Sequence, residues 1–170
     1  MSYHALKPLS LLRFNNVGAS DSGISYVLCV PFGMAENQYL LRPIGVIESP
    51  LKFLDDCPKQ GSEGAPDAWL IIDSAFAQGV DGLIVGTQIW VVTWLHQGRR
   101  DVFKVRPRGD PSRPFQGVFS TRSPNRPNPI GLHRAVIKEV ERTARIRVGP
   151  IEVLDGTPVL DIKPVIAGES

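Results

Sequence analysis

The chain has 170 residues, enough for one domain with its own hydrophobic core, and 42% apolar against 21% charged residues excludes disorder as its overall state. The 16 glycines and 15 prolines make up about 18% of the chain against a usual ~12%, which favours short strands and turns over long helices. The formal net charge is only +2. Two cysteines (Cys29 and Cys57) are too few for a disulfide scaffold, and no apolar run reaches the ~18 residues that span a bilayer. We therefore expect a cytoplasmic protein.

The first 33 residues differ from the rest of the chain. Residues 15–23 have turn composition without periodicity, and Met34 is followed by Ala-Glu-Asn, a plausible start of its own. We expect residues 1–33 to be an N-terminal extension of uncertain structure, or an artefact of the assigned start site. Residues 34–170 then form one domain.

From Met34 onward, short apolar runs alternate with turn residues. A polar loop is expected at 54–66, and a short helix at 74–82 with Asp73 or Ser74 as its N-cap. The predicted strands are residues 43–50, 69–73, 89–95, 132–141, 144–150 and 159–164, with the fourth and fifth forming a hairpin around Arg142-Thr143. This succession predicts a mostly β protein, a small antiparallel β-barrel.

Residues 106–129 contain six of the fifteen prolines. Because the residue before a proline is pushed towards extended geometry, the segment is predicted to be an ordered, extended loop. Long loops of this kind are often functional.

Positive charge is concentrated in one part of the chain. Residues 99–134 hold nine basic and two acidic residues, a net charge of +7, so the remainder sums to −5. Such asymmetry suggests an anionic partner, with nucleic acid as the first candidate. The alternative is a solvated loop of arginines that acids from elsewhere balance in space.

Motifs for nucleotide-binding helices, phosphate loops, zinc proteases and paired C-x-x-C sites are absent from the sequence, which disfavours a metal site and a Rossmann domain. The densest signal is the segment 119–132, which holds Arg122 and Arg126 in a frame stiffened by prolines. Such a frame offers forked donors to a carboxylate, a phosphate or a carbonyl. The turn Asp155-Gly156-Thr157-Pro158 could grip a nucleoside through its backbone, or be an ordinary hairpin turn.

Together, segments 117–132 and 154–164 resemble the signature of the tRNA N6-threonylcarbamoyladenosine methyltransferase family, the TsaA-like (TrmO, YaeB-like) proteins. Residues 44–50 resemble the family's first strand, Pro58-Lys59-Gln60 its Pro-Arg/Lys-Gln loop, and 90–97 its aromatic strand ending in a histidine. The resemblance covers residues 43–166. It implies a small β-barrel, usually a homodimer, that binds S-adenosylmethionine without a Rossmann fold. The implied reaction is methyl transfer to N6 of threonylcarbamoyladenosine next to the tRNA anticodon, at position 37.

The resemblance also implies roles for individual residues. Arg122 would suit the methionine carboxylate of the cofactor, and Asp155 or His96 is the hypothetical acceptor of the N6 proton. Arg126 and Asn128 are expected to shape the pocket or the dimer seam around it, and Lys163 is expected at the substrate pocket. The expected cofactor contacts are Pro58, Lys59, Gln60, His96, Gln97, Arg122, Leu132, Asp155, Gly156, Thr157 and Pro158.

Two positions depart from the family pattern. Asn125 stands where many relatives carry an aromatic residue, and Val165 where a tyrosine is common. Both departures bear on the RNA substrate more than on the cofactor. Two alternatives therefore stay open: a cofactor-binding barrel that acts on another RNA or a small molecule, and a module that binds S-adenosylmethionine or RNA without turnover.

Overall fold

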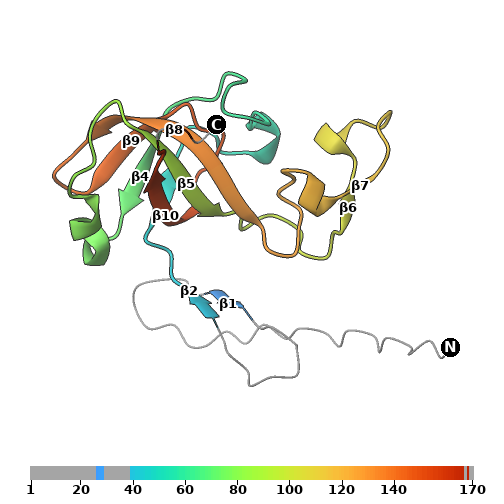
Figure 1. Ribbon diagram of the computed structural model, residues 1–170, viewed down its shortest axis with the longest axis horizontal. Helices are drawn as coiled ribbons and strands as arrows, with labels where there is room; N and C mark the ends of the chain where they lie inside the picture. The colour runs from blue at the N-terminus through green and yellow to red at the C-terminus, as the bar shows by residue number, and fades with distance from the viewer. Residues whose placement is uncertain (1–25, 29–38, 167, 169–170) are drawn as a thin grey trace.

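The computed structural model describes residues 26–28, 39–166 and 168. Its main body contains six strands: β3 (Gly45–Glu48), β4 (Ala68–Ile72), β5 (Gln88–Trp94), β8 (Ile130–Val140), β9 (Arg145–Gly149) and β10 (Pro158–Pro164). They close into an antiparallel barrel in the order β10, β3, β4, β9, β8, β5 (Figure 1). The small antiparallel barrel expected from the sequence is confirmed.

The strands form because apolar residues recur at every second position. In β4 the buried residues are Ala68, Leu70 and Ile72, and in β8 the inward side alternates with exposed residues over most of its length. Ile47, Ile89, Ile137 and other aliphatic side chains fill the interior with almost no exposure. Because a six-stranded barrel packed in this way has no room for a ligand inside, a binding site has to lie at one of its ends.

The predicted helix at 74–82 is a 3-10 helix, η2 (Ser74–Val80). The Asp73 carboxylate caps it by accepting a hydrogen bond of 2.9 Å from the Ala75 N–H. The predicted hairpin is formed by β8 and β9, which pair through registers such as Ile137 with Val148. The proline-rich loop contains two further 3-10 turns, η3 (Pro107–Gly109) and η4 (Val118–Ser120), and η1 (Leu54–Asp56) lies in the polar loop after β3.

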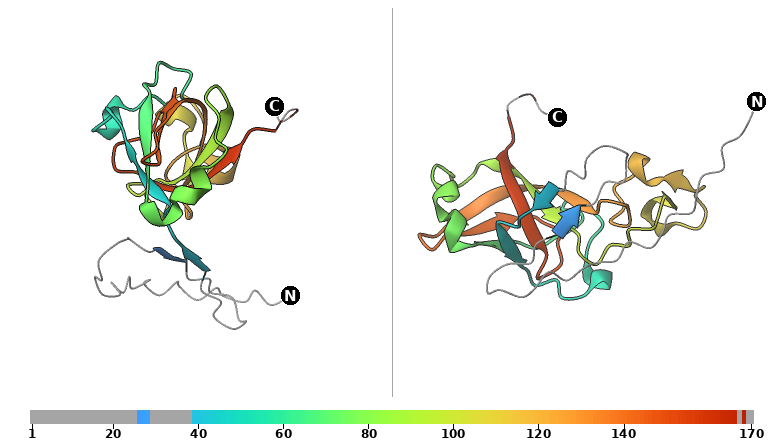
Figure 2. Two further views of the ribbon diagram at one scale, coloured as in Figure 1. Left: turned by 90° about the vertical axis from the view of Figure 1, so that its left-hand side faces the viewer. Right: turned by 90° about the horizontal axis from the view of Figure 1, so that it is seen from below.

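Two small sheets lie outside the barrel (Figure 2). One pairs β1 (Tyr26–Leu28) with β2 (Tyr39–Leu41), so these two strands flank the boundary expected at residue 34. Most of the expected extension lies outside the described residues. The other sheet pairs β6 (Lys104–Val105), just before the proline-rich loop, with β7 (Gln116–Gly117) inside it. Within the described residues, no helix has the length and apolar character to cross a membrane.

Strand direction determines which loops meet. Because neighbouring strands run antiparallel, the connections β3–β4, β5–β8 and β9–β10 all emerge at one end of the barrel. These connections are residues 49–67, 95–129 and 150–157. They carry the motifs that the sequence separates most widely.

Candidate functional site

A pocket of about 700 Å³ lies between these three connections. This volume is in the range of small-molecule sites. Its apolar wall includes Leu54, Leu95, Val105, Val153 and Leu154. The structure brings seven of the residues expected at the site to the pocket lining: Pro58, Lys59, Gln60, His96, Gln97, Arg122 and Thr157.

The walls of the pocket are tied to one another across the loops. The Lys59 ammonium donates a hydrogen bond to the carbonyl of Arg108, and the Arg108 guanidinium pairs with Glu63 at 2.7 Å. A Cβ at Gly98 would overlap the Pro124 carbonyl oxygen, so only glycine allows these two backbone segments to approach so closely. The loop that carries Pro58-Lys59-Gln60 is thereby held against the proline-rich loop.

Arg122 and Arg126 have different surroundings, although only four residues separate them. The Arg126 guanidinium donates to the carbonyls of Ser123 at 2.8 Å, of Val118 at 2.9 Å and of Thr121. It therefore anchors the loop from inside and does not line the pocket. Arg122 lines the pocket and, among the residues that the structure describes, makes no hydrogen bond, so its guanidinium can receive a ligand.

A buried hydrogen-bonded chain that the motifs did not reveal forms another wall. His133 is 7% exposed; its Nε2 lies 2.9 Å from Thr93 Oγ1 and its Nδ1 lies 2.8 Å from Glu152 Oε1. Both His133 and Glu152 line the pocket. Burial alone would raise the pKa of Glu152, but the hydrogen bond and charge of His133, together with the charge of Arg122, lower this pKa below its ordinary value. The pocket thus contains an ionised carboxylate.

Two sequence signals could have revealed this chain. His133 occupies an inward position of β8, between Gly131 and Ala135, where an apolar residue is the rule. Glu152 interrupts the apolar run Ile151-Glu152-Val153-Leu154. A polar residue inside an apolar pattern is an informative exception.

His96 lies two residues after the end of β5, is half-buried and lines the pocket. Burial lowers the pKa of this imidazole. Its Nδ1 is buried and, within the described part of the chain, has no hydrogen-bond partner. Burial, and the lack of an acceptor for a second ring proton, both favour the neutral form of His96.

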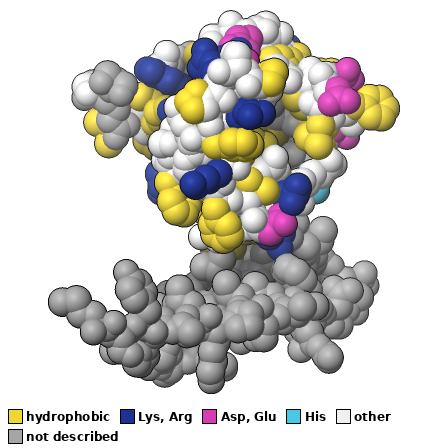
Figure 3. Space-filling view, turned by 90° about the vertical axis from the view of Figure 1, so that its right-hand side faces the viewer, with side chains coloured by type: hydrophobic (Ala, Val, Ile, Leu, Met, Phe, Trp, Pro, Cys, Tyr) yellow, Lys and Arg dark blue, Asp and Glu magenta, His cyan; other side chains and the backbone are white. Residues whose placement is uncertain are grey.

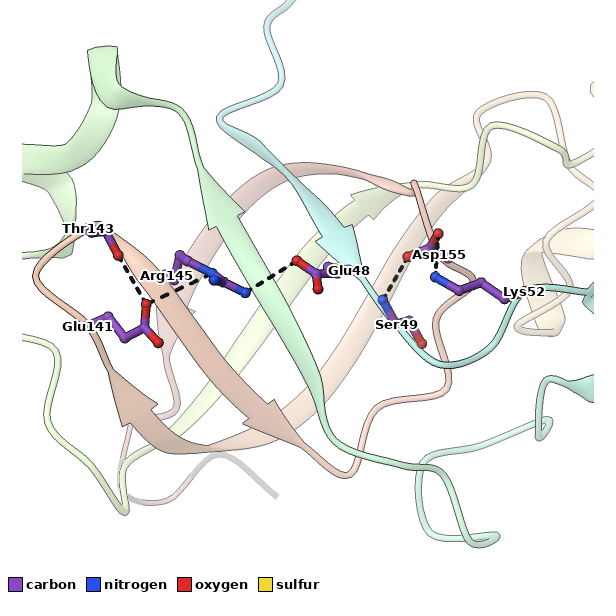
Figure 4. A network of polar contacts seen from close by, with 7 residues as sticks. All are labelled: Glu48, Ser49, Lys52, Glu141, Thr143, Arg145 and Asp155. Carbon is purple, nitrogen blue, oxygen red and sulfur yellow. Dashed lines mark hydrogen bonds and ion pairs between the residues drawn. The ribbon is translucent and has the colours of Figure 1, made fainter.

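The Asp155 side chain does not line the pocket and instead binds the β3–β4 connection. Its Oδ1 accepts a 2.8 Å hydrogen bond from the Ser49 N–H, and its Oδ2 pairs with Lys52 at 2.8 Å (Figure 4). The hydrogen-bonded pair with Lys52, followed by the Ser49 N–H, holds the pKa of this carboxylate below its usual range. Gly156 has φ of +74°, which a tight turn requires at this position. The turn therefore fastens the β9–β10 connection to the β3–β4 connection.

The remaining expected residues lie away from the pocket lining. Leu132 is exposed on β8, and Lys163 pairs with Asp161 on β10 at 2.8 Å. Asn128 and Gly156 are exposed, and Pro158 is buried where β10 begins.

Fold and pocket together define a class: a small ligand-binding β-barrel whose site is made by loops at one end and not by a Rossmann crevice. Residues 46–168 match the family model of the tRNA-methyltransferase O N-terminal domain, so the chain belongs to this family, as its motifs predicted. It is 41% identical over 131 residues to a probable S-adenosyl-L-methionine-binding protein of Methanothermobacter thermautotrophicus, covering 77% of this chain and 93% of that protein.

Two further relatives are longer than this chain. The tRNA (adenine(37)-N6)-methyltransferase of Escherichia coli is 33% identical over 138 residues, which cover 76% of this chain and 59% of that protein. The crystal structure of TrmO from Pseudomonas aeruginosa superposes with a TM-score of 0.58 at 31% identity, covering 73% of this chain and 54% of that chain. This chain therefore spans little more than half the length of these two relatives.

Proposed function

We propose that this protein transfers a methyl group from S-adenosylmethionine to N6 of an adenine in tRNA, and that the adenine is threonylcarbamoyladenosine at position 37. The observation that carries the proposal is a pocket lined by Arg122, Glu152 and His96 in a chain of this family. The methyltransferase named from Escherichia coli supports adenine N6 as the acceptor. The threonylcarbamoyl group rests on the resemblance of the motifs.

The donor set of the pocket fits S-adenosylmethionine. The forked guanidinium of Arg122 can donate two hydrogen bonds to the methionine carboxylate. Glu152 provides a negative charge for the positively charged groups of the same molecule, its ammonium and its sulfonium. Leu54, Leu95 and Val153 offer apolar surface for the adenine ring. When bound, this cofactor supplies an electrophilic methyl group on positively charged sulfur; a nitrogen nucleophile can attack the methyl carbon in line, and the sulfur leaves as the neutral thioether of S-adenosylhomocysteine.

The residues of the chain have three tasks in such a transfer. Arg122 and Glu152 orient the donor, because an in-line displacement depends mainly on alignment. His96 accepts the proton that N6 loses, since its imidazole lines the pocket and burial favours its neutral form. Asp155 is the weaker candidate for this base, because Lys52 and Ser49 already occupy its two oxygens.

His133 is proposed as a positioning residue. It holds Glu152 through Nδ1 and is itself held by Thr93 through Nε2. A carboxylate fixed in this way loses little entropy when a cation binds. Replacement of His133 is therefore expected to weaken cofactor binding through Glu152.

The test is to incubate the protein with labelled S-adenosylmethionine and total tRNA from a threonylcarbamoylating cell, followed by nucleoside analysis. Methylated threonylcarbamoyladenosine is the expected product. His96→Asn should slow transfer at unchanged cofactor affinity, whereas Arg122→Ala and Glu152→Gln should weaken cofactor binding. Asp155→Asn tests the weaker candidate and should leave transfer nearly unchanged, because Asp155 lies outside the pocket lining. If cofactor binds but no nucleoside is methylated, the tRNA activity is refuted, and turnover of a small molecule or binding alone becomes the better account.

A further inference from the structure

A basic arm, residues 99–119, projects from the barrel beside the pocket (Figure 1). It contains β6, η3, β7 and the start of η4. This segment contains six basic and two acidic residues, a net charge of +4 over 21 residues. Figure 3 views the molecule from this side, and basic and apolar side chains lie next to one another across it.

Three phenylalanines of the arm are exposed: Phe103 by 65%, Phe115 by 61% and Phe119 by 83%. They are not the core of the arm, whose fully buried apolar residue is Val118 at 1% exposure. The Arg106 guanidinium lies 4.5 Å from the centre of the Phe115 ring, so a cation and an aromatic face already form one surface. Three exposed phenyl rings among positive charges need a partner that has both flat apolar faces and negative charge.

The arm borders the pocket directly. Arg106, Arg108 and Gln116 belong to the pocket lining, as does Ser120, the immediate neighbour of Phe119. Phe119, which carries the most exposed phenyl ring of the arm, is therefore next in the chain to a residue of the pocket lining. A base that enters the pocket would bring its neighbours in the strand against this part of the arm.

We propose that the basic arm binds the unpaired bases that flank the reacting nucleotide, by stacking on Phe119 and Phe115, while Lys104 and Arg106 contact phosphates. This inference rests on the proposed function for the choice of RNA. Aromatic faces bind unpaired bases with little sequence preference, and arginine adds a cation–π contribution. A second copy of this chain suits the surface less well, because a symmetric contact would bring two segments of charge +4 together.

The test measures binding of two RNA probes: a hairpin with a loop of unpaired bases, and a fully paired duplex of the same length. Phe119→Ala should weaken hairpin binding by about five- to a hundredfold. Phe119→Trp should retain it, and Phe119→Leu, which keeps apolar area without a flat face, should not. Ile84→Ala removes another exposed apolar side chain, 68% exposed, outside the arm and should change nothing. Lys104→Ser should reduce the salt dependence of binding.

The outcomes separate this inference from the proposed function. It is supported if Phe119→Ala weakens hairpin binding while cofactor affinity and duplex binding stay unchanged, even in a protein that transfers no methyl group. It is overturned if Phe119→Ala binds the hairpin like the wild type, or if Phe119→Leu matches Phe119→Trp. A change from dimer to monomer in Phe119→Ala, at unchanged RNA affinity, would also overturn it and assign the arm to a contact between copies.

Discussion

A single methyl group at Gly131 should be among the most costly small substitutions in this protein. Gly131 lies on β8, opposite Thr93 on β5. An ideal Cβ built there would lie well within 3.0 Å of both Thr93 Oγ1 and His133 Nε2. These two atoms are 2.9 Å apart in the structure and form the hydrogen bond that holds His133. The added methyl group would have to displace this buried pair.

The expected loss of stability has two parts. Forcing a methyl group into a packed interior costs about 1–3 kcal/mol. Leaving the buried Thr93 hydroxyl or the His133 ring without its partner costs about 1–3 kcal/mol more, because Thr93 is 0% and His133 7% exposed. Gly131→Ala should therefore lower the free energy of unfolding by about 2–6 kcal/mol. At roughly 3–5 °C per kcal/mol for a domain of this size, Tm should fall by about 6–30 °C.

Gly117→Ala is the matched control, because Gly117 also lies on a strand and a Cβ there meets no atom within 4 Å. Thermal and urea unfolding followed by circular dichroism would measure both variants. Combining Gly131→Ala with Thr93→Ala should cost less than the sum of the two single changes, since the smaller residue makes room. If Gly131→Ala unfolds within about one degree of Gly117→Ala, the interpretation of Thr93 and His133 as a rigid pair is wrong.

Three further predictions concern the loops and the base. Arg126→Ala removes three hydrogen bonds from the proline-rich loop and should cost about 2–4 kcal/mol in urea unfolding, whereas Arg122→Ala should leave Tm unchanged and weaken cofactor binding in calorimetry. The methyl-transfer rate should fall as pH drops through the pKa of His96, which burial holds below the usual ~6.5, and His96→Asn should lose this limb of the pH–rate profile. The pKa of Asp155 is lowered in the folded state, so its contribution to stability is present above about pH 3.9 and is lost as pH falls through the folded pKa. Asp155→Asn should therefore cost less than about 1 kcal/mol near pH 7 and flatten this acid dependence of urea unfolding. The rate of methyl transfer should stay nearly unchanged.

The parts of the fold that periodicity encodes could be predicted from sequence. The runs that became β4 and β5 were recognisable from β-branched and aromatic residues, and the cap at Asp73 from its place before a short helical segment. The two-residue strands β6 and β7 were not, because pairs of residues in a proline-rich loop have no measurable period. The barrel was expected mostly from family resemblance, with support from the succession of short strands, because strand order depends on contacts between distant segments.

The site was predicted unevenly for a related reason. Motifs identified Lys59, His96 and Arg122, which line the pocket, but they also included Arg126 and Asp155, whose polar atoms bind the protein itself. Sequence alone cannot distinguish a guanidinium that receives a ligand from one that holds a loop, because both occur in the same motif. The difference lies in which carbonyls are within reach, and only the folded loop determines that.

The high proline and glycine content of the chain has a physical reason. The barrel interior is filled, so the alignment that methyl transfer needs has to come from irregular loops. Irregular loops lack a ladder of backbone hydrogen bonds, and here side chains such as Arg126 and Asp155 bind the loop backbone in its place. Prolines lower the entropy that these loops lose on folding, and Gly98 and Gly131 permit approaches that any Cβ would block. A site that depends on precise loops without regular structure therefore requires many prolines and glycines.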